Sequence, residues 1–311
     1  MILISLLMAL GAERYLSTPI WQFRTYYNLY LKMLSKNVQL NKLWQSEGGT
    51  LLLIFVPVTV LYIAMWILDN SVLDTVLSTL ILIVCLGSFT TRKAYKNYLT
   101  AAFRGDQTAS KLYHEQLLTD KNLPDMSFAQ ALIWLNYRHY IAIMLFFILF
   151  GISGAVFYRL VCTIVDKQIT ERFDERDIDD ICDEACTKEE NNKVDTDDVE
   201  TEIPTCIEAE CYIGCQRVLF WLDWLPVRIT SFGYMFVGHF SKALPTWLES
   251  IFDIKKASHD ILGDVAKKSE DVLIDDKDCT AEPCLLVRLA KRNVMLLLAL
   301  VAILTLSGII S

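Results

Sequence analysis

The sequence contains none of the short motifs that mark common nucleotide-binding and catalytic sites. GxxxxGK[ST], GxGxxG, HExxH and GxSxG are all missing. The four histidines lack the spacing of metal ligands. No basic stripe with interleaved aromatic residues occurs outside the flanks of apolar runs, which argues against nucleic acid as a partner. We therefore expect no cofactor and no metal site, and the residues favour a non-enzymatic role.

Charge is missing from four long stretches of this chain. Hydrophobic residues make up 53% of the 311 positions, and the mean hydropathy is +0.35. The uncharged runs are Thr50–Leu68, Thr75–Thr91, Tyr140–Tyr158 and Asn293–Ser311. A helix of about 19 residues is about 28 Å long, close to the ~30 Å of a bilayer's hydrocarbon core. The pattern predicts an all-α, polytopic integral membrane protein with the lipid bilayer as its partner.

Periodicity and charge divide the chain into five parts. The membrane region at 1–165 is expected to contain a partial helix at 1–12, an amphipathic interfacial helix at 22–45, membrane helices at about 50–68, 72–91 and 140–162, and a cytoplasmic helical segment at 92–139. The remaining parts are an acidic, cysteine-rich extramembrane insert at 166–216, a motif region at 217–252, a polar segment at 253–287 and a C-terminal membrane helix at 288–311.

Lysine and arginine set the expected orientation. They are frequent at 13–48 and at 92–139 but absent from the short turn at 69–71, so both longer segments should face the cytoplasm. The helix at 140–162 would then carry the chain outward. The acidic stretch at 166–210, with 18 acids and 5 basic residues, would lie outside.

Two charges complicate the stretch Val218–Phe240. Asp223 and Arg228 cost about 5–7 kcal/mol inside a membrane helix, which roughly cancels the gain from its apolar side chains. We expect this stretch to cross the membrane or to form a re-entrant segment. The other interpretation is an interfacial helix anchored by Trp221 and Trp224.

Five cysteines fall in or next to the insert: Cys182, Cys186, Cys206, Cys211 and Cys215. Outside the cytoplasm two disulfides would staple a segment that is too polar to fold alone. In the cytoplasm the same cysteines would indicate a metal site, although no CxxC occurs, or free thiols. We favour disulfides, and their connectivity is open.

Four stretches resemble one family in the same order. They are ERYLSTPIWQ at 13–22, YLTAAFRGDQ at 98–107, ALIWLNYRHYIA at 131–142 and LFWLDWLPVRITSFGYMFVGHFSKALPTW at 219–247. On these four stretches the chain resembles the AmpE family. The insert at 166–216 and, more weakly, the segment 253–284 depart from the family pattern.

The AmpE resemblance implies a multi-pass protein of the cell inner membrane that modulates signalling in β-lactamase induction and peptidoglycan recycling. Components of those processes would be its partners. It supplies no catalytic residues. The segment LDWLPVRIT also resembles an element of the CbiB/CobD cobinamide-phosphate synthases, which implies a membrane-bound amide-forming enzyme as the alternative. A small-molecule transporter ranks last, because no inverted repeat is visible.

Polar residues near the apolar runs are the candidate functional cluster, because ionisable groups in a membrane are usually functional. They are Glu13, Arg14, Arg104, Asp106, Asn136, Arg138, Asp223, Pro226, Arg228 and His239. We expect Pro226 to break its helix. Each group also has a structural interpretation, as a helix cap, a helix end or a side chain that reaches to the lipid headgroups.

Overall fold

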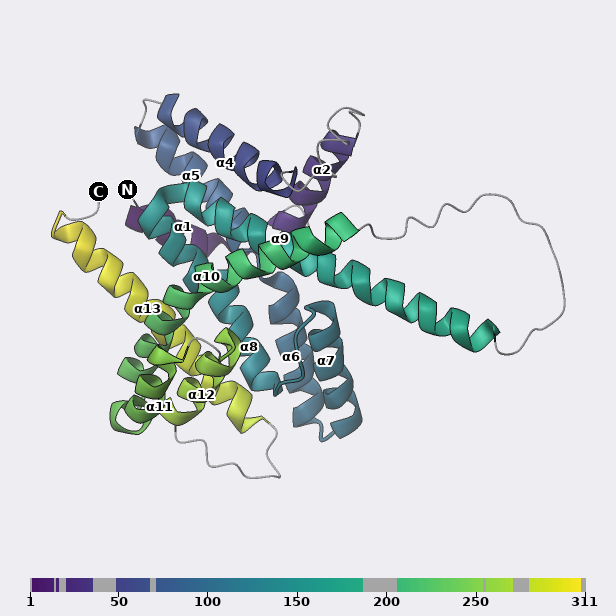
Figure 1. The fold of residues 1–311 in the computed structure, drawn as a ribbon. Helices are drawn as coiled ribbons and strands as arrows, with labels where there is room; N and C mark the ends of the chain where they lie inside the picture. Colours follow the sequence, from purple (N-terminus) through teal and green to yellow (C-terminus); the bar gives the residue numbers. More distant parts are fainter. Residues whose placement is uncertain are drawn as a thin grey trace.

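The computed structural model describes most of the chain. The described residues are 2–13, 15–16, 21–35, 49–67, 71–186, 206–253, 256–270 and 280–308, without the side chains of 34–35, 49–53, 71, 167–186 and 206–213. The described part is helical and contains no strand, which confirms the predicted all-α class (Figure 1).

The helices are named in chain order. They are α1 (Ile2–Glu13), α2 (Phe23–Ser35), α4 (Gly49–Ile67), α5 (Ser71–Leu86), α6 (Phe89–Phe103), α7 (Gln107–Asp120), α8 (Phe128–Asn136), the π-helical turn η2 (Tyr137–Ile141), α9 (Ala142–Cys186), α10 (Cys206–Val237), α11 (Phe240–Phe252), α12 (Ser258–Ser269) and α13 (Ala281–Leu306).

Two helices of the described chain are long and apolar enough to cross a membrane. They are Phe128–Asp166, which comprises α8, η2 and the first part of α9, and Ala281–Leu306. A bent pair, Val72–Leu86 and Phe89–Phe103, adds a third if its two members, which meet at 42°, count as one span. Ile2–Glu13 and the described apolar part of α4, Ile54–Ile67, are shorter. The prediction of four spanning helices is therefore supported only in part.

The chain reverses direction inside the first of these segments. Gly151 has φ 68° and ψ −159°, values that interrupt the helix. The rings of Phe146 and Tyr158 are stacked with their centroids 4.9 Å apart, although twelve helical residues would separate them by about 18 Å. The predicted single membrane helix at 140–162 is therefore wrong, because Gly151 folds it into a helical hairpin (Figure 1).

The two ends of the hairpin lie close together. Arg138 on one arm forms an ion pair with Asp166 on the other, at 2.9 Å. The arm from Arg138 to Gly151 is about 20 Å long, which is shorter than a hydrocarbon core. At the tip, Leu149 and Phe150 are exposed. An apolar tip and a charged mouth are the pattern of a re-entrant segment.

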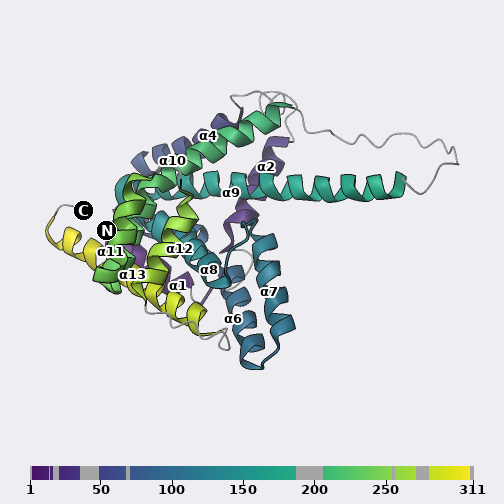
Figure 2. The same cartoon turned by 60° about the horizontal axis from the view of Figure 1, so that its bottom comes forward.

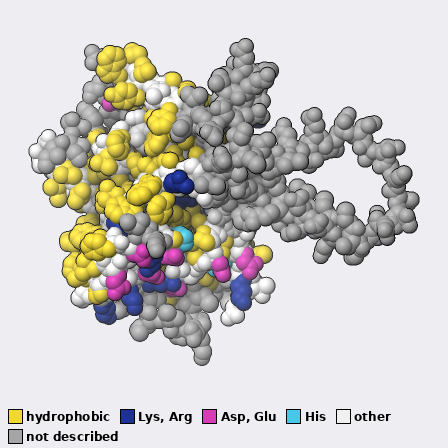
Figure 3. Space-filling view, viewed as in Figure 1, with side chains coloured by type: hydrophobic (Ala, Val, Ile, Leu, Met, Phe, Trp, Pro, Cys, Tyr) yellow, Lys and Arg dark blue, Asp and Glu magenta, His cyan; other side chains and the backbone are white. Residues whose placement is uncertain are grey.

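Exposed apolar side chains form a stripe along α10. The stripe recurs every three or four residues and consists of Val218, Trp221, Leu225, Ile229, Phe232 and Phe236. The opposite side of this helix carries the buried Asp223, and the buried Arg228 lies at one flank of the stripe. Figure 3 shows hydrophobic side chains over the region of α4, α5 and α10, and charged side chains gathered below them near α11 and α12. One part of this face is therefore suited to lipid and the other to water.

Two predicted helix boundaries differ from the structure. α10 continues through Pro226 instead of breaking there, and the carbonyl of Trp224 accepts a hydrogen bond from Arg228 while that of Pro226 accepts one from Thr230. The proline leaves the carbonyl of Leu222 without its usual N–H donor, and packing against neighbouring helices makes this tolerable. The last helix begins at Ala281 instead of 288, with Pro283 in its first turn, where a missing N–H is harmless.

The amphipathic helix α2 packs as its periodicity predicts. Phe23 and Tyr27 are buried in the core, and Leu31 packs against it. The predicted continuation of this helix beyond residue 35 lies outside the described residues.

Candidate functional site

The π-helical turn η2 connects several polar clusters. Its successive side chains Tyr137, Arg138, His139 and Tyr140 each have a different environment, because neighbouring residues of a helix point in directions about 100° apart. Such turns are frequent at functional sites. Tyr137 contacts a carboxylate on α10, Arg138 one on α9 and Tyr140 one on α1. His139 lines a cavity.

Asp223 on α10 is buried, with 3% of its surface exposed. Its Oδ1 accepts hydrogen bonds from the hydroxyl groups of Tyr137, at 2.7 Å, and Tyr158, at 2.8 Å. The two tyrosines belong to opposite arms of the hairpin. Asp223 therefore joins α10 to both arms, and the sequence pattern of Asp223 gave no sign of these tyrosine partners.

Glu13 forms a second buried cluster, where α1 meets α6. Ser88 donates to Oε1 from its hydroxyl group at 2.9 Å, and Tyr140 donates to Oε2 at 3.1 Å. Arg92 forms an ion pair with the same carboxylate at 3.0 Å. This carboxylate is only 5% exposed and has partners on two other helices.

Arg228 does not pair with Asp223. Its guanidinium donates to the carbonyl oxygens of Ile251 at 3.1 Å, Ser250 at 3.3 Å and Asp253 at 3.0 Å, all at the C-terminal end of α11. A cation there satisfies carbonyls that have no intrahelical partner and faces the negative end of the helix dipole. The guanidinium also lies over the ring of Trp224, at 4.2 Å from its centroid.

The other predicted site residues are not brought together. His239 precedes α11, and its backbone N–H donates to Ser269 at 2.7 Å. His239 follows the end of α10, whereas Asp223 lies about 21 Å before that end, so the two side chains do not share a site. Asp106 caps α7 by accepting from the Ala109 N–H at 2.9 Å, and Arg104 ends α6 in the same exposed turn.

The remaining predicted residues are Asn136, Arg14 and the cysteines of the insert. Asn136 lies just before η2, and its buried Oδ1 has no hydrogen-bond partner within the described chain. Arg14 lies outside the described residues, as do the side chains of Cys182, Cys186, Cys206 and Cys211. Cys215 is buried on α10. The disulfide hypothesis therefore stays a prediction.

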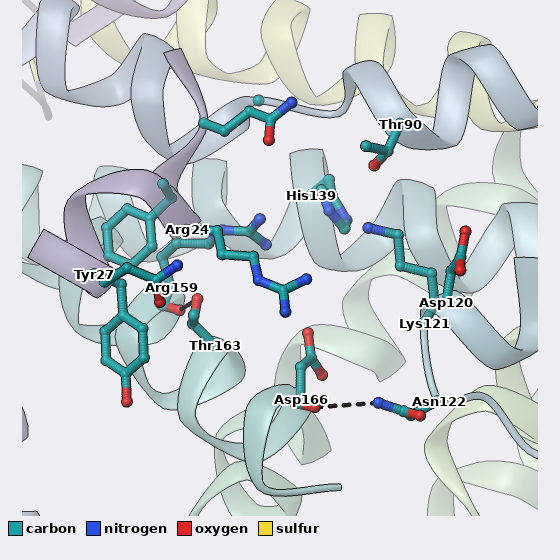
Figure 4. A pocket seen from close by; sticks show the side chains of 14 residues that line it. Arg24, Tyr27, Thr90, Asp120, Lys121, Asn122, His139, Arg159, Thr163 and Asp166 are labelled. Atoms are coloured by element: carbon teal, nitrogen blue, oxygen red, sulfur yellow. Dashed lines mark hydrogen bonds between the residues drawn. The ribbon is translucent and has the colours of Figure 1, made fainter. Parts of the chain in front are cut away.

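A cavity of about 140 Å³ opens beside the mouth of the hairpin (Figure 4). Three cationic side chains line it: Arg24 from α2, Lys121 from the α7–α8 loop and Arg159 from the second hairpin arm. Burial lowers the pKa of Lys121, and the positive charge of Arg159 lowers it further. Sequence reasoning missed this site. One available signal was Arg159, a charge inside the predicted membrane helix 140–162.

The fold and these clusters define a class of protein: a helical, membrane-associated protein whose buried charges are mostly engaged by its own helices. A family model described as "Regulatory signalling modulator protein AmpE" matches residues 1–169 and 205–311. The chain belongs to the AmpE family, and it is a regulatory accessory protein.

A curated relative agrees with this assignment. "Protein AmpE" from Shigella flexneri is 25% identical over 237 residues, which cover 74% of this chain and 72% of the relative. The family match leaves out 170–204, which lies within the predicted insert, and it includes 253–284, which we expected to match weakly. No solved structure matches the chain.

Proposed function

We propose that this chain is a multi-pass accessory protein of the inner membrane that modulates signalling linked to β-lactamase induction and peptidoglycan recycling. The observation that carries the proposal is the family match, which extends over both sides of the unmatched segment 170–204. The lipid-facing stripe of α10 and the apolar hairpin tip support the membrane location. Partners would be components of those two processes.

The internal contacts favour a regulator over an enzyme. Four of the five N–H donors of Arg228 are used by backbone carbonyls, and Asp223 is shielded by two tyrosines. Neither group is available to a substrate. The alternative of an amide-forming enzyme depends on these two residues, and it stays a prediction. In a regulator, a conformational change at the mouth of the hairpin would reach α10 through η2, by the hydrogen bond from Tyr137 to Asp223.

A complementation experiment tests the proposal. A strain that carries an inducible β-lactamase is deleted for this protein, and induction by a β-lactam is measured before and after complementation. We expect deletion to change the induction response and the wild-type chain to restore it. An unchanged response in the deletion strain would contradict the proposed function. Nucleotide turnover by the purified protein would favour the enzyme instead.

A second arm tests the role of η2. We expect Tyr137→Phe to restore induction less well than wild type at equal membrane abundance, because it removes the hydrogen bond from η2 to Asp223 on α10. The matched control is Tyr26→Phe, at an exposed tyrosine of α2. If both variants restore induction equally well, η2 has no part in signalling. The accessory role would then be judged by the deletion experiment alone.

A further inference from the structure

The cavity at the hairpin mouth collects cations from parts of the chain that are distant in sequence. Arg24 is on α2, Lys121 follows α7, and Arg159 is on α9, and all three side chains point into one space in Figure 4. Like charges repel each other, and partial burial strengthens the repulsion. Three separate elements that converge in this way form an electrostatically unfavourable arrangement unless an anion is present.

The two acidic residues at the cavity, Asp120 and Asp166, offset these three positive charges only in part. Asp166 lines the cavity, but it is already paired with Arg138 at 2.9 Å. Asp120 is exposed to solvent. Among the described residues, Arg24, Lys121 and Arg159 form no ion pair with a carboxylate, so an excess of positive charge remains around the cavity.

Arg159 supplies a second, independent observation. Its Nε is fully buried and has no hydrogen-bond partner in the described part of the chain. A buried donor without a partner is costly, and native proteins rarely leave one. The side chain lies at a distance of 6.0 Å from the ring centroid of Phe23, which holds it at the cavity wall. The guanidinium is thus positioned in advance for an acceptor.

We propose that this cavity binds a phosphate group, held by Arg24, Lys121 and Arg159. Cations that arrive from three elements suit a tetrahedral anion with several acceptor oxygens better than a planar carboxylate with two. A volume of about 140 Å³ has room for such a group. The group belongs either to a free phosphate compound or to the headgroup of an anionic phospholipid. The inference goes beyond the proposed function and does not depend on it.

Binding is tested on the purified full-length chain. The thermal midpoint is followed by tryptophan fluorescence in uncharged detergent, with inorganic phosphate, pyrophosphate or acetate at constant ionic strength. The same measurement is made in phosphatidylcholine nanodiscs with and without phosphatidylglycerol. We expect phosphate and pyrophosphate, or phosphatidylglycerol, to raise the midpoint more than acetate. A response to the soluble anions identifies a free phosphate compound, and a response to phosphatidylglycerol alone identifies the headgroup.

Substitutions assign the effect to the cavity. We expect Arg24→Gln and Lys121→Gln each to weaken binding about tenfold, since each removes a charge-assisted contact. Arg217→Gln and Lys111→Gln, at exposed positions outside the cavity, are the matched controls and should bind as wild type. Both cavity variants keep the core side chains, and their unliganded midpoints verify the fold.

Two results would overturn the inference. One is the absence of any difference between phosphate-bearing probes and acetate in wild type. The other is an equal response in the cavity variants and the controls. Because binding is measured without the induction assay, a normal induction phenotype together with no binding would reject the phosphate site alone.

Discussion

Buried ionisable residues in this protein are accommodated by several partners each. Glu13 has partners on two other helices, Asp223 accepts from two tyrosines, and Arg228 donates to four carbonyls. A charge removed from water costs several kcal/mol unless such contacts replace its hydration. These side chains therefore fix the relative positions of α1, α9, α10 and α11.

Asp223→Ala should destabilise the protein strongly. It leaves the hydroxyl groups of Tyr137 and Tyr158 buried without an acceptor, at a cost of about 1–3 kcal/mol for each group. Tyr158→Phe should cost less, about 1 kcal/mol, because Asp223 keeps its other donor. Thermal midpoints in detergent measure both effects, with the exposed Glu115→Ala as control. A midpoint for Asp223→Ala equal to that of Glu115→Ala would contradict the central role of this carboxylate.

Arg228→Ala should reduce the amount of folded protein in the membrane. The substitution leaves carbonyls at the end of α11 without donors, and we expect a loss of about 3 kcal/mol or more in the free energy of unfolding. Immunoblots of membrane fractions measure the abundance, with Arg217→Ala on the exposed side of the same helix as control. Normal abundance with a lost phenotype would instead favour the enzyme alternative.

At the scale of single elements, one glycine decides the course of the most apolar segment. Gly151 adopts a combination of φ and ψ that is almost restricted to glycine. No atom lies within 4 Å of the position that a Cβ would take, so the constraint comes from the backbone and not from packing. Without this turn, the arms that contact Asp223 would separate.

Gly151→Ala should therefore lower stability by about 1–3 kcal/mol. Gly11→Ala is a closely matched control, because Gly11 also has nothing within 4 Å but lies in the regular helix α1. We expect that substitution to be neutral or slightly stabilising, since alanine favours a helix over glycine. Thermal midpoints compare the two variants, and a smaller effect at Gly151 than at Gly11 would argue against the hairpin turn.

At the scale of the whole molecule, the hairpin changes the expected topology. A segment that enters the membrane and returns leaves both ends on one side (Figure 2 shows α8 and α9 from a second direction). Residues 166–216 should then lie on the same side as 92–139, contrary to the outward crossing inferred from a single helix. In the cytoplasm, the disulfide hypothesis would lose its basis, because that compartment is reducing.

Reporter fusions test this topology. One fusion is placed within 166–216 and another in the turn at Gly105, between α6 and α7. We expect both reporters to give the cytoplasmic signal. Opposite signals would show that the segment 140–162 crosses the membrane, and would restore the periplasmic insert and its disulfides as the better interpretation.

Much of the fold could be predicted from hydropathy and periodicity. The apolar runs lie in helices, and Phe23 and Tyr27 are buried as their spacing requires. The site was less predictable. Asp223 and Glu13 stood out as charges near apolar runs, but their partners are 65 or more residues away for Asp223 and 75 or more for the side-chain contacts of Glu13. Periodicity is a local signal and carries no information about such contacts.

The sequence by itself determined that the chain is helical, which stretches are apolar and which family it belongs to, because these properties depend on residue type and local order. Only the tertiary structure decided that the most apolar segment folds back on itself, that Asp223 and Arg228 have separate partners, and that three cations share one cavity. Those outcomes depend on the packing of distant helices, where burial makes each unpaired charge costly and so selects one arrangement.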